Sequence, residues 1–362
     1  MKKFVFMFLG VALLMLAACG ADSGEKDSAN KTDASASKKI SIVATIYPQY
    51  DWLKNVLGNR LDAFDLKLLL KNGTDLHSYK PSAQDIASIA SADMVVFVGG
   101  ESDEWIEKAL EATPKQGRIL VNLMAALGDR VKEEEVVEGM QVEEHEHHEH
   151  AEEHDHEHHE HADPSAHSGT LEHAEEHEHH EEVENDEHIW LSLKNAEVLV
   201  NRIAEELAKL DAENATIYKA NASAYVAKLN ELDEAYRVTV AGASHKTILF
   251  GDRFPFRYLV DDYGIKYYAA FVGCSAESEA SFETVAFLAG KMDSLALPAI
   301  FAIDGSNQKI AKSILAASKN SKQAEVLILN SLQSVTDAQM KSGLNYLAVM
   351  QANLDVLKKA LK

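Results

Sequence analysis

The stretch PSAQDIASIASADMVVFVGG, residues 81–100, joins an amphipathic segment directly to a short apolar run. Pro81 suits the first turn of a helix, where its missing N–H has no hydrogen bond to lose. The run MVVFV at residues 94–98 predicts a buried strand. Helical patterns that alternate with buried strands are typical of parallel βαβ units, so this stretch predicts an α/β fold.

The same alternation extends in both directions along the chain. The further predicted strands are ISIVATI (40–46), LKLLL (66–70), ILVNL (119–123), TILF (247–250), IKYYAAFV (265–272), AIFAI (299–303) and EVLIL (325–329). Between the two groups of strands, residues 212–241 carry apolar side chains at spacings of three and four, beginning with Tyr218 and Ala222, which predicts one long helix. We therefore predict two α/β lobes, 40–211 and 242–362, each with a roughly four-stranded parallel sheet flanked by helices, joined by this spine helix.

The N-terminus has the pattern of an exported and lipid-modified protein. After two lysines, residues 4–16 form a 13-residue apolar run, which is short for a membrane span but typical of a signal sequence. LAAC at 16–19 resembles the lipobox of bacterial lipoproteins, which implies a signal peptide at 1–18 and lipid attachment to Cys19. The polar residues 19–39 then predict a solvated tether. The alternative is an ordinary signal peptide with a chance cysteine.

The net charge of −23 is concentrated in one segment. Residues 133–187 contain 23 acidic residues and no Lys or Arg, whereas the rest of the chain has 35 acidic and 35 basic residues. The balanced remainder has no basic stripe, which argues against a nucleic-acid-binding protein. A segment of this composition cannot bury a core, so we expect 133–187 to be a disordered insert in the first lobe.

The insert is also rich in histidine, with 14 histidines in residues 145–180. Neutral imidazole is a good ligand for zinc, copper and nickel, and nearby carboxylates attract cations. A flexible chain loses conformational entropy when it wraps an ion, so we predict an accessory metal collector of modest affinity. The alternative is a solvated acidic spacer. The predicted accessory ligands are His145, His147, His148, His150, His154, His156, His158, His159 and His161.

Side chains of the metal-binding type follow several predicted strands, where ligands bind in open parallel sheets. His77, Asp252 and Cys274 each come shortly after a strand, and His188 follows the insert directly. The third histidine outside the insert, His245, lies at the predicted end of the long helix and should be solvated. The alternatives remain open: a loop histidine can bond its neighbours, Asp252 can cap a helix or pair with an arginine, and a cysteine without a disulfide partner can be a small buried residue.

Two motifs carry a resemblance to a known family. GTDLHSYKPSAQDIASIASADMVVFVGG (73–100) and DEHIWLSLKNAEVLVNRIAEEL (186–207) resemble signatures of the metal-specific solute-binding lipoproteins of bacterial ABC importers, the zinc/manganese receptor family. The resemblance covers nearly all of residues 40–361, including the position of the histidine-rich insert. It implies two rigid lobes with a metal ion in the cleft between them, and it implies that His77 and His188 are metal ligands.

The sequence departs from the family at two further ligand positions. Zinc members usually have a histidine at the position that corresponds to Gly251, so this ligand is missing here. A family aspartate corresponds to Asn330, which is a weak ligand. We predict that Cys274 and Asp252 replace them, because two histidines, a thiolate and a carboxylate form a sound tetrahedral site for Zn²⁺. Manganese, which favours oxygen-rich sites, fits this set less well. Further candidates are Glu277, Glu279 and Asp304.

The resulting functional prediction is a monomeric receptor, lipid-anchored at the extracytoplasmic face of the cell membrane. It would bind Zn²⁺ in the cleft and deliver it to an ABC permease for uptake. The alternatives are a surface metal buffer or adhesion lipoprotein, which would need only the insert, or a manganese-specific receptor. An enzyme is not expected, because the sequence has no nucleophile elbow and no His-Glu-x-x-His motif, and Glu187 beside His188 is the one candidate general base.

Overall fold

The computed structural model describes residues 39–141, 184–275, 279–321 and 323–362. The predicted signal peptide, Cys19 and all the histidines of the insert lie outside these residues. No helix in the described part of the chain combines the length and the apolar character that are needed to cross a membrane.

The first lobe is built on a parallel four-stranded sheet with the strand order β2-β1-β3-β4. Its strands overlap the predicted apolar runs, and the amphipathic segment that precedes the run MVVFV forms a helix, as predicted. The elements are β1 (Ile40–Ala44), α1 (Tyr47–Leu57), β2 (Phe64–Leu68), α2 (Ala83–Ser91), β3 (Met94–Phe97), α3 (Glu104–Ala112), β4 (Ile119–Asn122) and α4 (Leu123–Leu127). Pro81 lies just before α2 and not, as predicted, in its first turn, because Ser82 is the N-cap residue and forms a capping box with Asp85.

The second lobe repeats the architecture with the strand order β6-β5-β7-β8, again all parallel. Its elements are β5 (Thr247–Phe254), α7 (Arg257–Tyr263), β6 (Lys266–Val272), α8 (Phe282–Ser294), β7 (Ala299–Ile303), α9 (Lys309–Ala317), β8 (Glu325–Leu329) and α10 (Asp337–Lys341). Strand β5 is four residues longer than predicted and contains a register shift between Phe250 and Arg253. The bulge matters for the site, because it changes which side chain faces the other lobe.

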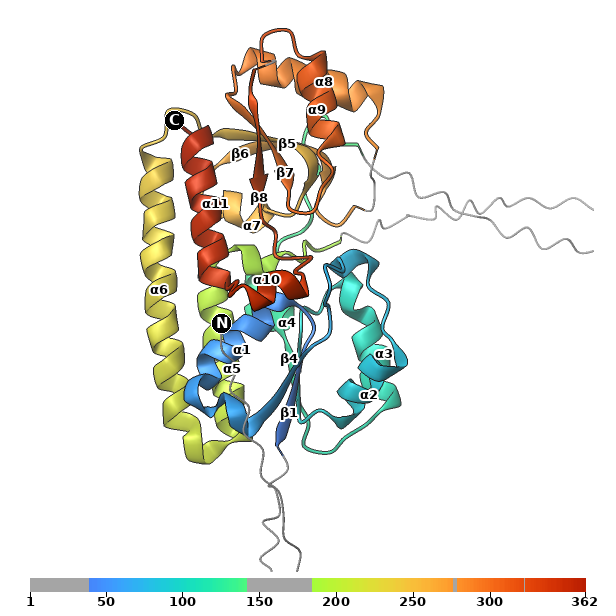
Figure 1. The fold of residues 1–362 in the computed structure, drawn as a ribbon, viewed down its shortest axis with the longest axis vertical. Helices are drawn as coiled ribbons and strands as arrows, with labels where there is room; N and C mark the ends of the chain where they lie inside the picture. The colour runs from blue at the N-terminus through green and yellow to red at the C-terminus, as the bar shows by residue number, and fades with distance from the viewer. Residues whose placement is uncertain (1–38, 142–183, 276–278, 322) are drawn as a thin grey trace, which may run out of the picture. The chain divides into compact units, whose positions relative to one another are not determined.

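Three long helices complete the fold: α5 (Leu193–Leu210) packs on the first lobe, whereas α6 (Ala215–Ala241) and α11 (Tyr346–Ala360) contact both lobes. The predicted spine helix is α6, which runs alongside both lobes and packs against α1 of the first and α7 of the second (Figure 1). Buried apolar residues of both lobes, such as Val95 and Phe301, belong to one continuous core. The prediction of two four-stranded α/β lobes with a long helix is therefore confirmed.

The borders of the insert differ from the prediction of disorder over 133–187. Glu133 pairs with Asn185 in a β-bridge, and the N–H of Asp186 donates to the carbonyl of Lys132 at 2.9 Å. Further on, the N–H of Gln141 donates to Ala270 of the edge strand β6 at 2.9 Å. These backbone hydrogen bonds hold the borders of the insert against the folded body, whereas the acidic composition of the borders had predicted disorder.

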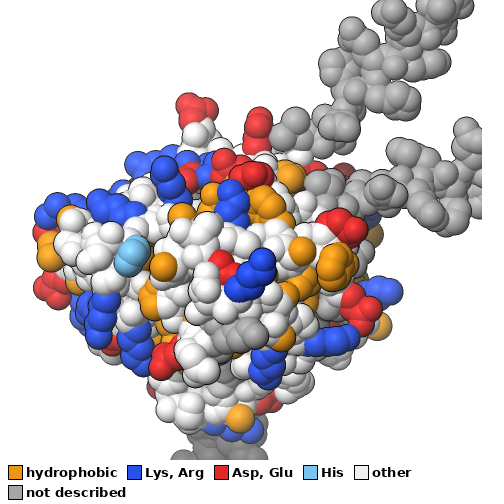
Figure 2. All heavy atoms as spheres, turned by 90° about the horizontal axis from the view of Figure 1, so that it is seen from above, with side chains coloured by type: hydrophobic (Ala, Val, Ile, Leu, Met, Phe, Trp, Pro, Cys, Tyr) orange, Lys and Arg blue, Asp and Glu red, His pale blue; other side chains and the backbone are white. Residues whose placement is uncertain are grey.

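The folded body presents charges of both signs at its surface. Figure 2 shows basic, acidic and apolar side chains interspersed over the end of the second lobe. This mixture agrees with the equal numbers of acidic and basic residues outside 133–187.

Candidate metal centre

Three of the four predicted ligands come together in the structure. The ligand atoms of His77, His188 and Cys274 all lie within 4.8 Å of one another. His77 belongs to a 3₁₀ turn, Leu76–Ser78, in the loop after β2, and Cys274 lies in the turn after β6. His188 precedes another 3₁₀ turn, Ile189–Leu191, just before α5. The strand-end rule thus located two of the three residues in space as well as in sequence.

His77 is held by its own loop and by a neighbouring turn. Its N–H donates to Oδ1 of Asp75 at 3.1 Å, and its Nδ1 lies 2.9 Å from the hydroxyl of Ser102. Burial, with smaller contributions from His188 and Arg253, lowers the pKa of His77 to about 2. The imidazole is therefore neutral at physiological pH, which is the form that binds a metal ion.

His188 is fully buried, and one carboxylate fixes its orientation. Oδ1 of Asp186 accepts from the His188 backbone N–H at 2.8 Å and lies 2.9 Å from Nδ1. Because an ionised carboxylate only accepts hydrogen bonds, Nδ1 carries the proton and the lone pair of Nε2 points away from Asp186. Carboxylates play this part beside many metal-bound histidines.

The two imidazoles have the spacing that one metal ion needs. Their Nε2 atoms are 3.1 Å apart. Two nitrogens bound to one tetrahedral Zn²⁺ at about 2.0 Å would be separated by roughly 3.3 Å. Gly273 lets the Cys274 loop approach this pair, because a Cβ at that position would lie 2.9 Å from Cε1 of His188.

Cys274 is held by a residue from the border of the insert. Its N–H donates to Oε1 of Glu134 at 3.1 Å. Burial, reinforced by the carboxylates of Glu134 and Asp186, raises the pKa of the Cys274 thiol well above its usual value. The thiol must therefore give up a proton when it binds a metal ion as a thiolate.

The structure adds Gln333, which the sequence analysis missed. This buried side chain places its Nε2 2.6 Å from Nε2 of His188 and 3.0 Å from Nε2 of His77. Its Oε1 is buried without a hydrogen-bond partner. Gln333 lies in the loop after β8, beyond a turn in which Leu332 has a φ of 60°. The sequence could have indicated Gln333 only as an amide side chain three residues after Asn330, the position that corresponds to the family aspartate.

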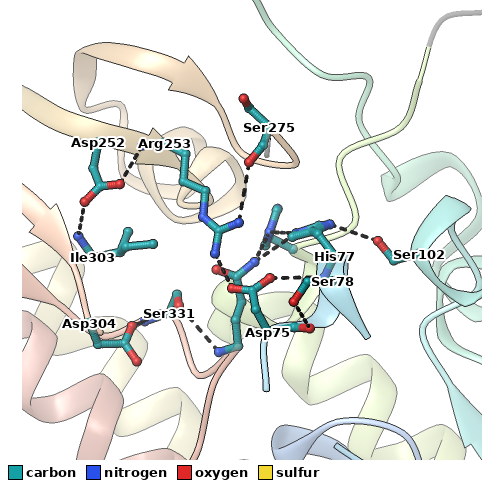
Figure 3. A network of polar contacts seen from close by, with 12 residues as sticks. Asp75, His77, Ser78, Ser102, Asp252, Arg253, Ser275, Ile303, Asp304 and Ser331 are labelled. Atoms are coloured by element: carbon teal, nitrogen blue, oxygen red, sulfur yellow. Dashed lines mark hydrogen bonds and ion pairs between the residues drawn. The ribbon is translucent and has the colours of Figure 1, made fainter. Parts of the chain in front are cut away.

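Asp252, the fourth predicted ligand, is not a member of the group. Its Oδ1 accepts from the N–H of Arg253 at 3.0 Å, and its Oδ2 accepts from the N–H of Ile303 at 3.4 Å. Figure 3 shows the carboxylate turned toward Ile303, while the next side chain, Arg253, extends toward Asp75 of the first lobe.

The two positions expected for family ligands also lie elsewhere. A Cβ at Gly251 would come within 2.4 Å of the Cα of Ala311 in α9, so this position faces the interior of the second lobe. Oδ1 of Asn330 accepts from the N–H of Leu332 at 2.8 Å and so stabilises the turn that presents Gln333.

The remaining candidates have other partners. Asp304 accepts from the N–H of Ser331 at 2.6 Å, and Glu279 pairs with Lys309 at 2.8 Å. Glu277 lies outside the described residues. His245 is exposed, as predicted for a solvated helix end.

A fold of two α/β lobes, with ligand-type side chains from both lobes in one group around the buried His188, defines a two-lobed metal-binding protein. Comparison with known families makes this more specific. The chain belongs to the family described as zinc-uptake complex component A, periplasmic, which matches residues 42–360. This description names a component of an uptake complex, which is not a class of enzyme.

Curated relatives carry related names. The chain is 31% identical over 366 residues to the zinc-binding lipoprotein AdcA of Streptococcus pneumoniae (strain ATCC BAA-255 / R6), a match that covers 99% of this chain and 61% of that protein. It therefore spans 61% of the length of that relative. It is 29% identical over 361 residues to the high-affinity zinc uptake system protein ZnuA of Bacillus subtilis (strain 168), covering 99% of this chain and 98% of that protein.

Solved structures confirm the architecture. The Zn(II)-bound ZnuA-like domain of Streptococcus pneumoniae AdcA superimposes with a TM-score of 0.63 at 27% identity, covering 89% of this chain and 99% of that one. The metal-dependent lipoprotein YcdH of Bacillus subtilis gives a TM-score of 0.65 at 26% identity, with the same coverage.

Proposed function

We propose that the chain is an extracytoplasmic, lipid-anchored and monomeric receptor that binds Zn²⁺ between its lobes and delivers it to an ABC permease. The observation that carries this proposal is the meeting of His77, His188 and Cys274 within 4.8 Å in a protein of the zinc-uptake family. The names of the relatives, a zinc-binding lipoprotein and a zinc uptake system protein, support both the cargo and the anchor.

The ligand set that we propose is His77, His188, Cys274 and Gln333, with Gln333 in the place that the sequence analysis gave to Asp252. The Gln333 amide already lies against both imidazoles, at 2.6 and 3.0 Å. Rotation of this amide by half a turn would exchange Nε2 for Oε1, whose lone pairs have no partner in the structure. A carbonyl-type oxygen can ligate a metal ion without adding charge.

This ligand set favours zinc over manganese. Thiolate and imidazole are preferred by Zn²⁺, whereas Mn²⁺ is bound best by carboxylates, carbonyls and water. Among the four proposed ligands, one is a neutral oxygen and none is a carboxylate. We therefore propose zinc as the transported ion, and we expect manganese to bind weakly.

We further propose that the histidine-rich insert is an accessory collector beside the cleft. Support comes from its composition, with 14 histidines in residues 145–180. Its described borders also lie at the site, because Glu134 bonds the Cys274 loop and Asp186 bonds His188. Ions held by the insert would thus be concentrated near the cleft.

Calorimetric zinc titration of protein without residues 1–19 tests the proposal. The variants are a deletion of residues 142–183, the same deletion with His77→Ala, and the same deletion with His245→Ala as a matched control at an exposed histidine. We expect one tight site that survives the deletion and the control but vanishes with His77→Ala. Loss of tight binding on deletion, together with unchanged binding by a further His77→Ala variant that keeps residues 142–183, would favour a surface buffer that needs only the insert.

A further inference from the structure

Arg253 occupies an unusual place on β5. Strand β5 pairs regularly with β6 up to Phe250, and pairing resumes at Arg253 after a register shift. A bulge of this kind bends a strand and re-aims its side chains. The tight contact of Gly251 with α9 fixes the start of the bulge, and the Arg253 side chain leaves it largely buried, 16% exposed, in the direction of the first lobe.

The guanidinium of Arg253 contacts two of the loops that carry proposed ligands, the His77 loop and the Cys274 loop. Nη2 pairs with Oδ2 of Asp75 in the first lobe, and Nη1 donates to the carbonyl of Ser275 in the second lobe at 3.5 Å (Figure 3). Asp75 in turn holds the backbone of His77 through its other oxygen, at 3.1 Å. Ser275 is the residue after Cys274. One side chain thus joins the supports of two proposed ligands from opposite lobes.

We propose that Arg253 is a positioning residue, not a ligand, which fastens the His77 loop to the Cys274 loop and thereby slows release of the bound ion. This inference rests on the proposed function of the site. The planar guanidinium can serve two acceptors in different directions, whereas a lysine ammonium at the end of a flexible chain is less able to hold both. We call the contacts of Arg253 with Asp75 and Ser275 the clasp, and both contacts together require an arginine at this position.

The clasp also determines how charges act on the ion. The cation of Arg253 lies near His77 and would repel a divalent ion, but the carboxylate of Asp75 neutralises it. Removal of Asp75 alone leaves an unpaired cation beside the metal, whereas removal of both partners does not. Asp75→Asn should therefore speed Zn²⁺ release more than Arg253→Gln does. The release rate of the double variant should lie closer to that of Arg253→Gln than to that of Asp75→Asn.

The test is the rate of Zn²⁺ release to a chelator, measured by stopped flow on protein with the insert intact and on protein without residues 142–183. The variants are Arg253→Lys, Arg253→Gln, Asp75→Asn and the Asp75→Asn/Arg253→Gln pair. Arg237→Gln is the matched control, because Arg237 forms an exposed ion pair on α6. We expect Arg253→Gln to speed release by about tenfold or more, since loss of one partner of a buried charged pair acts mainly on dissociation. Arg253→Lys should recover part of this loss.

Cobalt substitution separates positioning from ligation and from folding. Spectra of the Co²⁺-loaded variants should retain the thiolate-to-cobalt band, because no ligand is removed, and melting temperatures should show that each variant is folded. Release from Arg253→Gln at the wild-type rate would overturn the inference, as would effects of Asp75→Asn and Arg253→Gln that simply add. Absence of a tight site sensitive to His77→Ala in the wild type would instead overturn the proposed function, and this inference with it.

Discussion

The carboxylate of Asp186 offers a quantitative test of how the site is built. Asp186 is 3% exposed, and its Oδ1 bonds both the backbone N–H and the Nδ1 of His188, at 2.8 and 2.9 Å. Asp186→Asn keeps the shape of the side chain and an oxygen that can accept both hydrogen bonds, but it removes the negative charge. The substitution therefore isolates the effect of that charge on the imidazole.

The expected magnitude follows from the two hydrogen bonds. A hydrogen bond to a charged group contributes roughly 1.5–3 kcal/mol and a neutral one about 0.5–1.5 kcal/mol, so each bond loses about 1–1.5 kcal/mol. The backbone bond loses this with and without metal and affects folding stability only. The Nδ1 bond strengthens when Nε2 binds a cation. Removal of the negative charge from its acceptor should therefore lower zinc affinity by about tenfold.

The assay is a competition titration of zinc against a chromophoric chelator, with protein lacking residues 142–183. Asp262→Asn is the control, because this carboxylate is partly buried and accepts from the hydroxyl of Ser192 at 2.6 Å, outside the metal group. Ser102→Ala, which removes the neutral partner of His77 Nδ1, should have a smaller effect than Asp186→Asn. If Asp186→Asn binds zinc as tightly as the wild type, the carboxylate does not tune His188 and the argument is refuted.

Three further predictions concern other residues. Cys274→Ser should weaken zinc binding by at least about tenfold and should reduce the number of protons released on binding, measured by calorimetry in buffers of different ionisation enthalpy, because a serine hydroxyl is not deprotonated like a thiol. Gln333→Glu should strengthen Mn²⁺ binding more than Zn²⁺ binding, measured as the ratio of the two affinities, because it adds a carboxylate; an unchanged ratio would exclude Gln333 from the ligands. Burial raises the pKa of Asp103 to about 7. From about pH 4, its value in the unfolded chain, to about pH 7 the folded state retains a proton that the unfolded state has lost. Stability should therefore fall over this range, by up to about 4 kcal/mol, and Asp103→Asn should flatten this part of the urea-unfolding profile; a profile identical to that of the wild type would contradict the assignment.

The predictable part of the site consists of residues whose position follows from the end of a regular strand. His77 and Cys274 follow β2 and β6, which belong to different sheets, and within each sheet the parallel strands bring their carboxyl ends to one edge, where ligands bind. The fold was predictable for a related reason, since buried strands and amphipathic helices have periods that are visible in the sequence. His188 was found through the motif around it, which follows the insert.

The errors arise where the chain departs from a regular period. The bulge in β5 shifts the alternation of side chains, so that Arg253 rather than Asp252 reaches the other lobe. Gln333 depends on a turn with a positive φ at Leu332, a conformation that a leucine rarely adopts and that no local pattern predicts. Both features are set by tertiary contacts, which composition and spacing do not reveal.

The borders of the insert bear directly on how its role can be tested. By composition the insert runs from 133 to 187, but its borders include Glu134, which bonds the N–H of Cys274, and Asp186, which bonds His188. Deletion of the whole acidic segment would therefore remove two supports of the cleft ligands, together with Glu187, which accepts from the N–H of Ser102 beside His77. Such a variant should lose tight zinc binding even if the insert itself binds no ion tightly, and the loss would imitate a metal site within the insert. Deletion of residues 142–183 leaves these contacts intact, so only that deletion separates the collector from the cleft.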